Sequence, residues 1–322
     1  MADTLHPLRV RPGARFTCHG DGLCCTDVHA FGPLSDDEAA MLRAIDPAVV
    51  DDHHGERVVT LGAEGRCIFR RHGRCELHAS LGPDVKPASC QQFPFVFVAT
   101  PAGGRVATEH RCPCRTLGER AELTAEAAVA EAGRPETPDR RITDTLPRTA
   151  DERVTLAEWE AIEAPMLARL AAGDDPLDVL GAPPLDPPDR WRRHGASLLD
   201  EGGRTRFSAA VRRFGAALLR LGGAEVTGVD ERLGWDDVFD RAERRSPTPT
   251  DPAAQLNDWL ADALWSLEWA FRGPFDEARR ELATRVGVAR RIAADLEAEG
   301  RRPDRAMAEA IAVIELAALA DR

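Results

Sequence analysis

The sequence has no tyrosine, and aromatic residues make up only 5% of its 322 positions. Lysine is almost missing too, since Lys86 is the one lysine among 42 basic residues. With 54 acidic residues, the net charge is −12, which disfavours binding to phosphate backbones because these attract basic surfaces. We therefore expect no nucleic-acid partner. Apolar residues, at 43%, suffice for a folded core and exclude a disordered chain.

The sequence also lacks a long uninterrupted apolar run. The longest apolar stretch, residues 306–320, contains Glu309 and Glu315, so no segment is expected to span a bilayer. The first residues lack the basic and apolar segments of a secretory signal. We therefore expect no membrane partner and a cytoplasmic location.

Cysteine is missing after residue 114, whereas all six tryptophans come after that point. The first part is rich in glycine, and after Thr116 apolar residues recur at the three- and four-residue spacing of helices. We expect a cysteine-cluster domain over residues 1–115, a linker with a short helix over 116–150, and a helical domain over 151–322. The expected fold class is α+β and predominantly α: a small irregular cysteine-rich region with a β-hairpin, followed by an all-helical bundle.

The clearest local prediction in the first part is a hairpin. Strand-forming residues at 93–98 and 105–109 flank the Pro-Ala-Gly-Gly segment at 101–104. This hairpin would place Cys90 and Cys112 at the same open end. Their neighbourhood is the first reason to expect a shared site.

Capping boxes predict helix starts at Ser35 and Thr155, because each has a glutamate three residues later. We expect the first of these helices to run to about Ala44. An apolar stripe predicts a further helix that reaches Phe271: Leu256, Trp259, Leu260, Ala263, Leu264, Leu267 and Phe271. Two more helices are expected at about 275–299 and 305–320, separated by glycine and proline.

The eight cysteines are the strongest functional signal: Cys18, Cys24, Cys25, Cys67, Cys75, Cys90, Cys112 and Cys114. Thiols gather in this way for disulfides, zinc or iron. A cytoplasmic location disfavours disulfides, and no C-x2-C pair is present to build a zinc ribbon. The ferredoxin run C-x2-C-x2-C is absent as well, so neither metal follows from a standard spacing.

Thiolate number favours iron. Eight cysteines exceed one tetrahedral zinc set, and they suit one four-thiolate cluster with spare thiols or a second metal. We expect an iron–sulfur cluster of the 4Fe–4S type first, with zinc or mononuclear iron as alternatives. The cysteines from Cys24 to Cys90 are the first candidate ligands, and Cys18, Cys112 and Cys114 come next. Among the nearby histidines, His19 and His110 are the better candidates, because each lies within two residues of a cysteine.

The order of the cysteine segments resembles the CxxCxxCC cysteine-cluster family, which is described as a zinc- or iron-chelating domain and includes flagellin lysine N-methylases. Five segments carry the resemblance: Phe-Thr-Cys-His-Gly-Asp-Gly-Leu-Cys-Cys at 16–25, Cys-Ile-Phe at 67–69, Gly-Arg-Cys-Glu-Leu-His at 73–78, Pro-Ala-Ser-Cys-Gln-Gln-Phe-Pro-Phe at 87–95, and Glu-His-Arg-Cys-Pro at 109–113. Asp21 stands where the family pattern has its second cysteine. A carboxylate can also ligate iron or zinc, so Asp21 joins the candidate ligands.

For the methylase members, the resemblance implies an iron–sulfur centre, S-adenosylmethionine as methyl donor and a protein lysine as acceptor. The sequence shows no G-x-G-x-x-G loop after a strand, so an ordinary Rossmann-type methyltransferase is not supported. No catalytic or cofactor-binding residue can be named from the sequence. The motif G-x-S-x-G is absent, which argues against a serine hydrolase.

Two functions remain open. A catalytic metal protein, with a protein as its substrate, would have a cleft between the cysteine region and the helices, with one metal position open. A non-enzymatic protein with a structural, redox-sensing or metal-sensing centre would bury its metal with all ligand positions closed. The second hypothesis fits a glycine-rich region of about 100 residues, because such a small region is weakly packed and metal binding would supply folding free energy.

Overall fold

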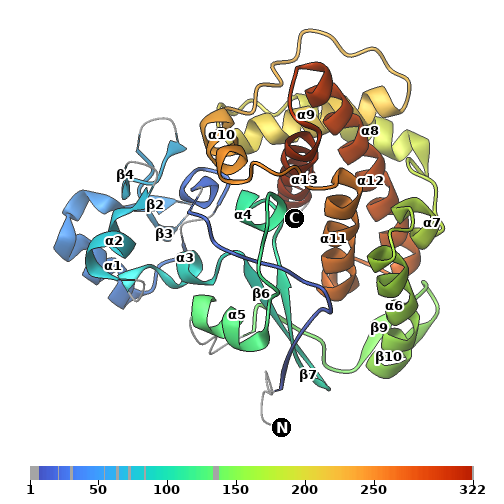
Figure 1. The fold of residues 1–322 in the computed structure, drawn as a ribbon, viewed down its shortest axis with the longest axis horizontal. Helices are drawn as coiled ribbons and strands as arrows, with labels where there is room; N and C mark the ends of the chain where they lie inside the picture. The colour runs from blue at the N-terminus through green and yellow to red at the C-terminus, as the bar shows by residue number, and fades with distance from the viewer. Residues whose placement is uncertain are drawn as a thin grey trace.

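The computed structural model describes residues 7–20, 22–29, 32–53, 55–62, 65–71, 74–82, 85–132 and 138–320. It is an α+β structure with about 53% helix and 14% strand, and its C-terminal part is helical, as expected. Figure 1 shows a small lobe made from α1 to α3 on the left and the helices α6 to α13 on the right. The hairpin β6–β7 lies between them.

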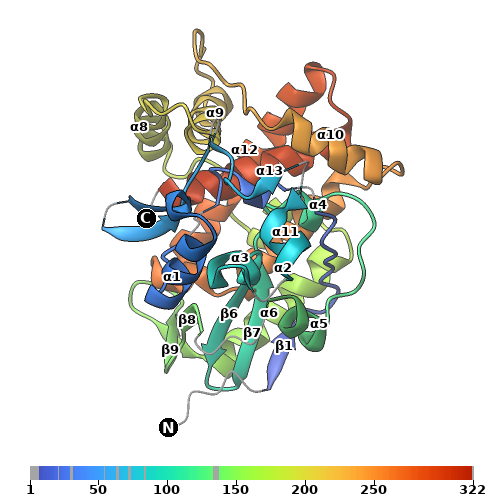
Figure 2. The ribbon, with the colours of Figure 1, turned by 90° about the vertical axis from the view of Figure 1, so that its left-hand side faces the viewer.

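The small lobe consists of short elements joined by turns. The Ser35 capping box is present and opens α1, which ends at Ile45, close to the expected end. The elements up to the hairpin are β1 (Leu8–Val10), η1 (Leu23–Cys25), α1 (Asp36–Ile45), η2 (Pro47–Val49), β2 (Val50–His53), β3 (Glu56–Val59), β4 (Arg70–Arg71), β5 (Arg74–Cys75), α2 (Glu76–Leu81) and α3 (Ala88–Gln92). Figure 2, seen from the side of this lobe, shows α1, α2 and α3 in front of the hairpin.

The predicted hairpin is confirmed and is longer than expected. Strands β6 (Phe95–Thr100) and β7 (Gly103–Thr108) pair in antiparallel register from Phe95↔Thr108 to Thr100↔Gly103, so the turn is only two residues long. Two strands that the sequence did not predict complete the sheet, in the order β1-β7-β6-β8. β1 runs parallel to β7, and β8 (Arg140–Arg141) runs parallel to β6.

Both faces of the hairpin are buried, which explains the nearly continuous apolar sequence of β6. Phe97 and Val106 pack on one face with Phe16 and with α5 (Ala125–Ala132). Val96, Val98 and Ala107 pack on the other face with the helices. The main hydrophobic core therefore extends across the expected boundary at residue 115, and the division into domains stays a prediction.

The helical part is built around α13 (Pro303–Ala320). From Ala306 to Leu316 its apolar residues are buried on every side, as in a helix that other helices surround. It packs against α4, α9, α10, α11 and α12. No helix of the described residues is both long and apolar enough to cross a membrane.

The other elements of this part are α4 (Pro113–Thr116), β9 (Thr145–Pro147), β10 (Arg153–Thr155), α6 (Leu156–Ala171), α7 (Pro176–Leu180), α8 (Pro188–Leu199), α9 (Arg206–Leu221), α10 (Asp236–Arg245), α11 (Pro252–Trp265), η5 (Glu268–Phe271) and α12 (Phe275–Ala298). The Thr155 capping box opens α6 as predicted. The expected linker over 116–150 contains α5, as predicted, and also the strands β8 and β9.

One helix prediction is wrong. The stripe that was expected to reach Phe271 ends with α11 at Trp265, because Leu267 adopts a left-handed backbone with φ +54°. The chain then turns through η5, which brings the Trp269 ring to 4.5 Å from that of Trp159. Phe271 consequently leaves the core and is exposed.

Gly103 allows the close approach of β1 to β7. Its φ is +105°, and a Cβ at this position would lie 2.5 Å from the carbonyl oxygen of Pro7. Gly173 has a similar φ of +89°, but its Cβ would meet nothing within 4 Å. We expect Gly103→Ala to lower the free energy of unfolding by about 2 kcal/mol more than Gly173→Ala, because only the first adds a backbone clash to the strain. Urea denaturation measures both, and equal losses would contradict the packing of β1.

Candidate functional site

Five cysteines come together in the small lobe and form the Cys67 group: Cys24, Cys25, Cys67, Cys75 and Cys90. The turn η1 carries the first two, β5 ends on Cys75, and α3 carries Cys90. The backbone N–H of Cys67 donates to the carbonyl of Cys25 at 3.0 Å, which holds its segment against η1. Segments distant in the sequence thus deliver thiols to one small core.

Burial and mutual proximity raise the pKa values of three of these thiols, those of Cys24, Cys67 and Cys90. Burial raises the pKa of Cys67 to about 12, and the nearby thiols of Cys90 and Cys75 add to the shift. The pKa of Cys90 is also raised to about 12, first by burial and then by Cys24. For Cys24, the hydrogen bond with Cys25 raises the pKa most, followed by burial. The protonated thiols are therefore favoured, and a metal cation is the charge that would convert them into thiolate ligands.

The other three cysteines, Cys18, Cys112 and Cys114, form the Cys114 group. Cys112 is the N-cap of α4 and Cys114 lies within that helix, and both are buried. Cys114 hydrogen-bonds with Cys18 and with Cys112. The Cys114 bond lowers the pKa of Cys112, but burial and the nearby Cys24 and Cys18 thiols raise it overall. Because Cys24 acts on Cys112, the two groups are neighbours.

None of the eight cysteines forms a disulfide. Within the described ranges, no group of three or more Cys, His, Asp or Glu side chains is arranged to hold a metal ion. The thiols are therefore gathered without converging on one point. Asp21, the candidate carboxylate ligand, lies outside the described residues.

The two candidate histidines differ in their surroundings. The backbone N–H of His19 donates to the sulfur of Cys114 at 3.2 Å, and its buried ring Nε2 has no hydrogen-bond partner. His110, in contrast, bonds through Nε2 to Asp262 at 2.9 Å. Burial, and then the Arg115 charge, lower the pKa of His110 to about 4, so its ring is neutral and donates to the carboxylate. The structure thus places His19 with the thiols and His110 with a carboxylate of α11.

Asp262 is the centre of a buried polar network that the sequence did not predict. Its Oδ1 accepts from Arg11 Nε at 2.6 Å, and its Oδ2 accepts from Thr108 Oγ1 at 2.6 Å and from Arg115 Nη2 at 2.8 Å. Both arginines also pair with Asp258, one turn earlier on α11. The two arginine charges outweigh the desolvation of Asp262 and hold the pKa of this carboxyl well below its usual range. The network fastens the N-terminal segment, β7 and α4 to one helix.

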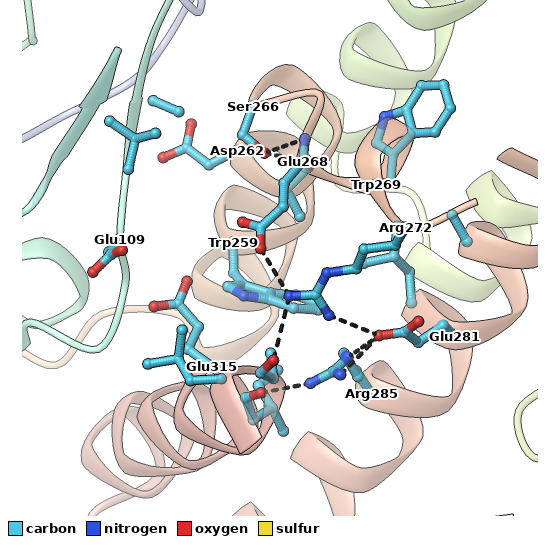
Figure 3. Close-up of a pocket in the computed structure, with 18 of the residues that line it drawn as sticks. Glu109, Trp259, Asp262, Ser266, Glu268, Trp269, Arg272, Glu281, Arg285 and Glu315 are labelled. Atoms are coloured by element: carbon cyan, nitrogen blue, oxygen red, sulfur yellow. Dashed lines mark hydrogen bonds and ion pairs between the residues drawn. The ribbon is translucent and has the colours of Figure 1, made fainter. Parts of the chain in front are cut away.

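A pocket opens next to this network, between the hairpin and the helices α11, α12 and α13 (Figure 3). Its volume is about 180 Å³, whereas a single water molecule needs roughly 10–15 Å³ on the same scale. A ligand of several heavy atoms therefore fits. Of the described residues that line the pocket, none is a cysteine. The catalytic hypothesis expected a cleft between the two regions; this pocket lies between them but apart from the thiols.

Glu315 extends from α13 into the pocket, toward Glu109 and Asp262 (Figure 3). Its Oε2 accepts the backbone N–H of Arg111 at 2.7 Å. Burial, reinforced by the Glu109 carboxylate, raises the pKa of Glu315 to about 8. In the sequence, the signal was the pair of glutamates within the most apolar helix, which excluded a membrane span but was not connected to a site.

No family model, no curated protein and no solved structure matches the chain. The resemblance to the cysteine-cluster family therefore stays a prediction that rests on the five sequence segments. The geometry of the thiols and of the pocket must carry the functional argument.

The Asp262 network should be a major source of stability. We expect Asp262→Asn to lower the free energy of unfolding by about 3 kcal/mol, because it leaves Arg11 and Arg115 buried with less counter-charge. The matched control is Asp230→Asn, which breaks an exposed pair with Arg232 and should leave the unfolding midpoint unchanged. Chemical denaturation followed by circular dichroism tests both. Equal unfolding free energies of the two variants would show that the network contributes little to stability.

Glu315 should make stability depend on pH. Its carboxyl has a folded-state pKa of about 8, whereas the unfolded chain ionises near pH 4.3. The folded state therefore loses stability as the pH rises between these values, by up to about 1.4 kcal/mol per pH unit. Glu315→Gln removes this loss, so its advantage over the parent protein in unfolding free energy should grow from pH 5.5 to pH 8. Glu277→Gln, at the exposed rim of the pocket, is the control. An advantage that does not change with pH would contradict the raised pKa.

Proposed function

We propose that this protein binds a metal centre through cysteine thiolates of the Cys67 group, with an iron–sulfur cluster as the first choice. The observation that carries the proposal is the gathering of five thiols, none of them in a disulfide, from separate segments into one small core. Soft thiolate donors in this number suit an iron–sulfur cluster or zinc. Cys18, Cys112, Cys114 and His19 would remain as spare donors or hold a second metal.

The donor set fits the metal in kind and number, and ligation requires local adjustment. The thiols of Cys24 and Cys25 now share a hydrogen bond, which a metal would replace. Cys24 and Cys25 lie on a 3-10 turn, and Cys75 ends a two-residue strand. The backbone of such short elements can move at a small cost in free energy, since metal sites commonly form together with the fold around them.

A structural centre fits the geometry better than a catalytic one. The core of the small lobe is a small cluster of apolar side chains in which four of the five cysteines of the Cys67 group take part, so a metal bound there would add directly to its cohesion. The pocket that could take a substrate has no cysteine among its described lining residues. The alternative, methylation of a protein lysine with S-adenosylmethionine, is supported by the position of the pocket between the two regions.

Metal analysis tests the proposal directly. Protein purified without oxygen should contain iron and acid-labile sulfide and absorb visible light. Cys90→Ser should lose most of the metal and destabilise residues 1–115 toward proteolysis, while the helical circular dichroism of the C-terminal part stays largely intact. Ala88→Ser is the control, because it changes an exposed residue of the same helix α3 and removes no thiol. Cys114→Ser should keep the centre if the Cys67 group alone holds it.

The outcomes separate the alternatives. Stoichiometric zinc in place of iron would keep the metal-binding function and overturn the cluster. Protein without any bound metal would overturn the proposal. Unchanged metal content in Cys90→Ser would remove Cys90 from the site.

A further inference from the structure

One end of the pocket is acidic without a matching cation. The carboxyl of Glu315 lies near that of Glu109 (Figure 3), whose charge acts on it, and Asp262 also lines the pocket. Asp262 is neutralised by Arg11 and Arg115, and Glu109 pairs with Arg111 at 2.5 Å. Glu315 has only backbone N–H donors from the segment of Arg111, and no ion pair forms on it among the described residues.

The arginines at the other end are engaged elsewhere. Arg272 donates to Glu268 at 2.8 Å and to the carbonyl of Ala318 at 3.3 Å. Arg285 donates to Glu281 at 2.7 Å and to the carbonyl of Ile314 at 2.8 Å. These bonds hold both guanidinium groups against α12 and α13, so neither neutralises Glu315. Burial and the Glu109 charge raise the pKa of Glu315, and the Arg111 charge, already paired with Glu109, offsets only part of this shift.

Apolar surface lines the space next to this carboxyl. Trp259 and Ala263 contribute it from α11, and Ile314 and Ala318 contribute it from α13. An aliphatic chain would be sheltered along these side chains, and an indole face also attracts a cation.

We propose that this pocket binds an organic ammonium group carried on an aliphatic chain, with Glu315 as its counter-charge. The backbone N–H groups of Arg111 and His110 both donate to the Glu315 carboxyl. A carboxylate has about four lone-pair sites, so it can still accept from a ligand. A compact ammonium needs one such acceptor, whereas a guanidinium fork is best matched by two. A free amine and an amine on a peptide share this chemistry. The proposal does not depend on the metal centre, whose thiols lie outside the pocket.

Calorimetric titration of the full-length protein with n-butylamine at pH 7.5 tests the proposal, with 1-butanol and butanoate as neutral and anionic probes of similar size. Butylammonium should bind at least about tenfold more tightly than either. Glu315→Gln should weaken butylammonium binding about tenfold or more, because a charged hydrogen bond is lost. Asp230→Asn, which changes an exposed carboxylate outside the lining of this pocket, should change it less than twofold. A blocked Gly-Lys-Gly peptide is the second probe. If it binds more tightly than butylamine, the natural ligand is an amine on a peptide side chain. If butylamine binds more tightly, the natural ligand is a free amine.

Three results would overturn the proposal: no binding of butylammonium at millimolar concentration, equal binding of butanol, or equal effects of the two substitutions. The metal content and melting temperature of Glu315→Gln are measured alongside at pH 7.5. The metal content should match that of the parent protein, and the melting temperature should be higher, as the raised pKa of Glu315 requires. If Glu315→Gln does not fold, Glu109→Gln replaces it and should weaken binding in the same direction. A parent protein that binds butylammonium but contains no metal would overturn the metal centre and leave the amine site standing.

Discussion

The charge network around Asp262 fixes the N-terminal segment, the hairpin and α4 against the helix α11. Its partners are Arg11 from the N-terminal segment, Thr108 and His110 from the end of β7, and Arg115 from α4. These segments precede the helical part in sequence, yet they meet on one face of α11. A buried charge is tolerated only when it is paired and hydrogen-bonded, so the segments that carry these charges can be placed in few other ways. The position of the hairpin, and with it the wall of the pocket, depends on that constraint.

Local sequence signals predicted the local structure well. The capping boxes at Ser35 and Thr155 began helices as expected, and strand-forming residues on both sides of a Pro-Gly segment located the hairpin. These features depend on neighbouring residues, so a short window contains the information. The helix that was expected to continue to Phe271 failed at Leu267, where packing of Trp269 against Trp159 outweighs the apolar periodicity. The strands β1 and β8 were missed because each is only two or three residues long and depends on a distant partner.

Part of the candidate site could be predicted from the sequence, and part could not. The cysteines could be singled out from their number and order, and the structure gathers them into two neighbouring groups. The Asp262 network and the pocket could not be predicted, because their residues are separated by more than 140 positions in the chain. Arginines at Arg11 and Arg115 look like any of the many arginines in this sequence. Only the fold reveals that they are buried, and that Glu315 is a carboxyl without a cation.

One short segment connects the thiols to the pocket. Residues 108–115 begin on the Asp262 network with Thr108, line the pocket with Glu109 and Arg111, and end with the buried Cys112 and Cys114. The backbone N–H of Arg111 binds Glu315, and the next residue caps α4. The same eight residues therefore contact the pocket and carry two thiols of the Cys114 group. Because Thr108, His110 and Arg115 all bond to Asp262, the position of this segment is fixed by α11. The fold thus places a group of gathered thiols and a pocket on the two sides of one short connection.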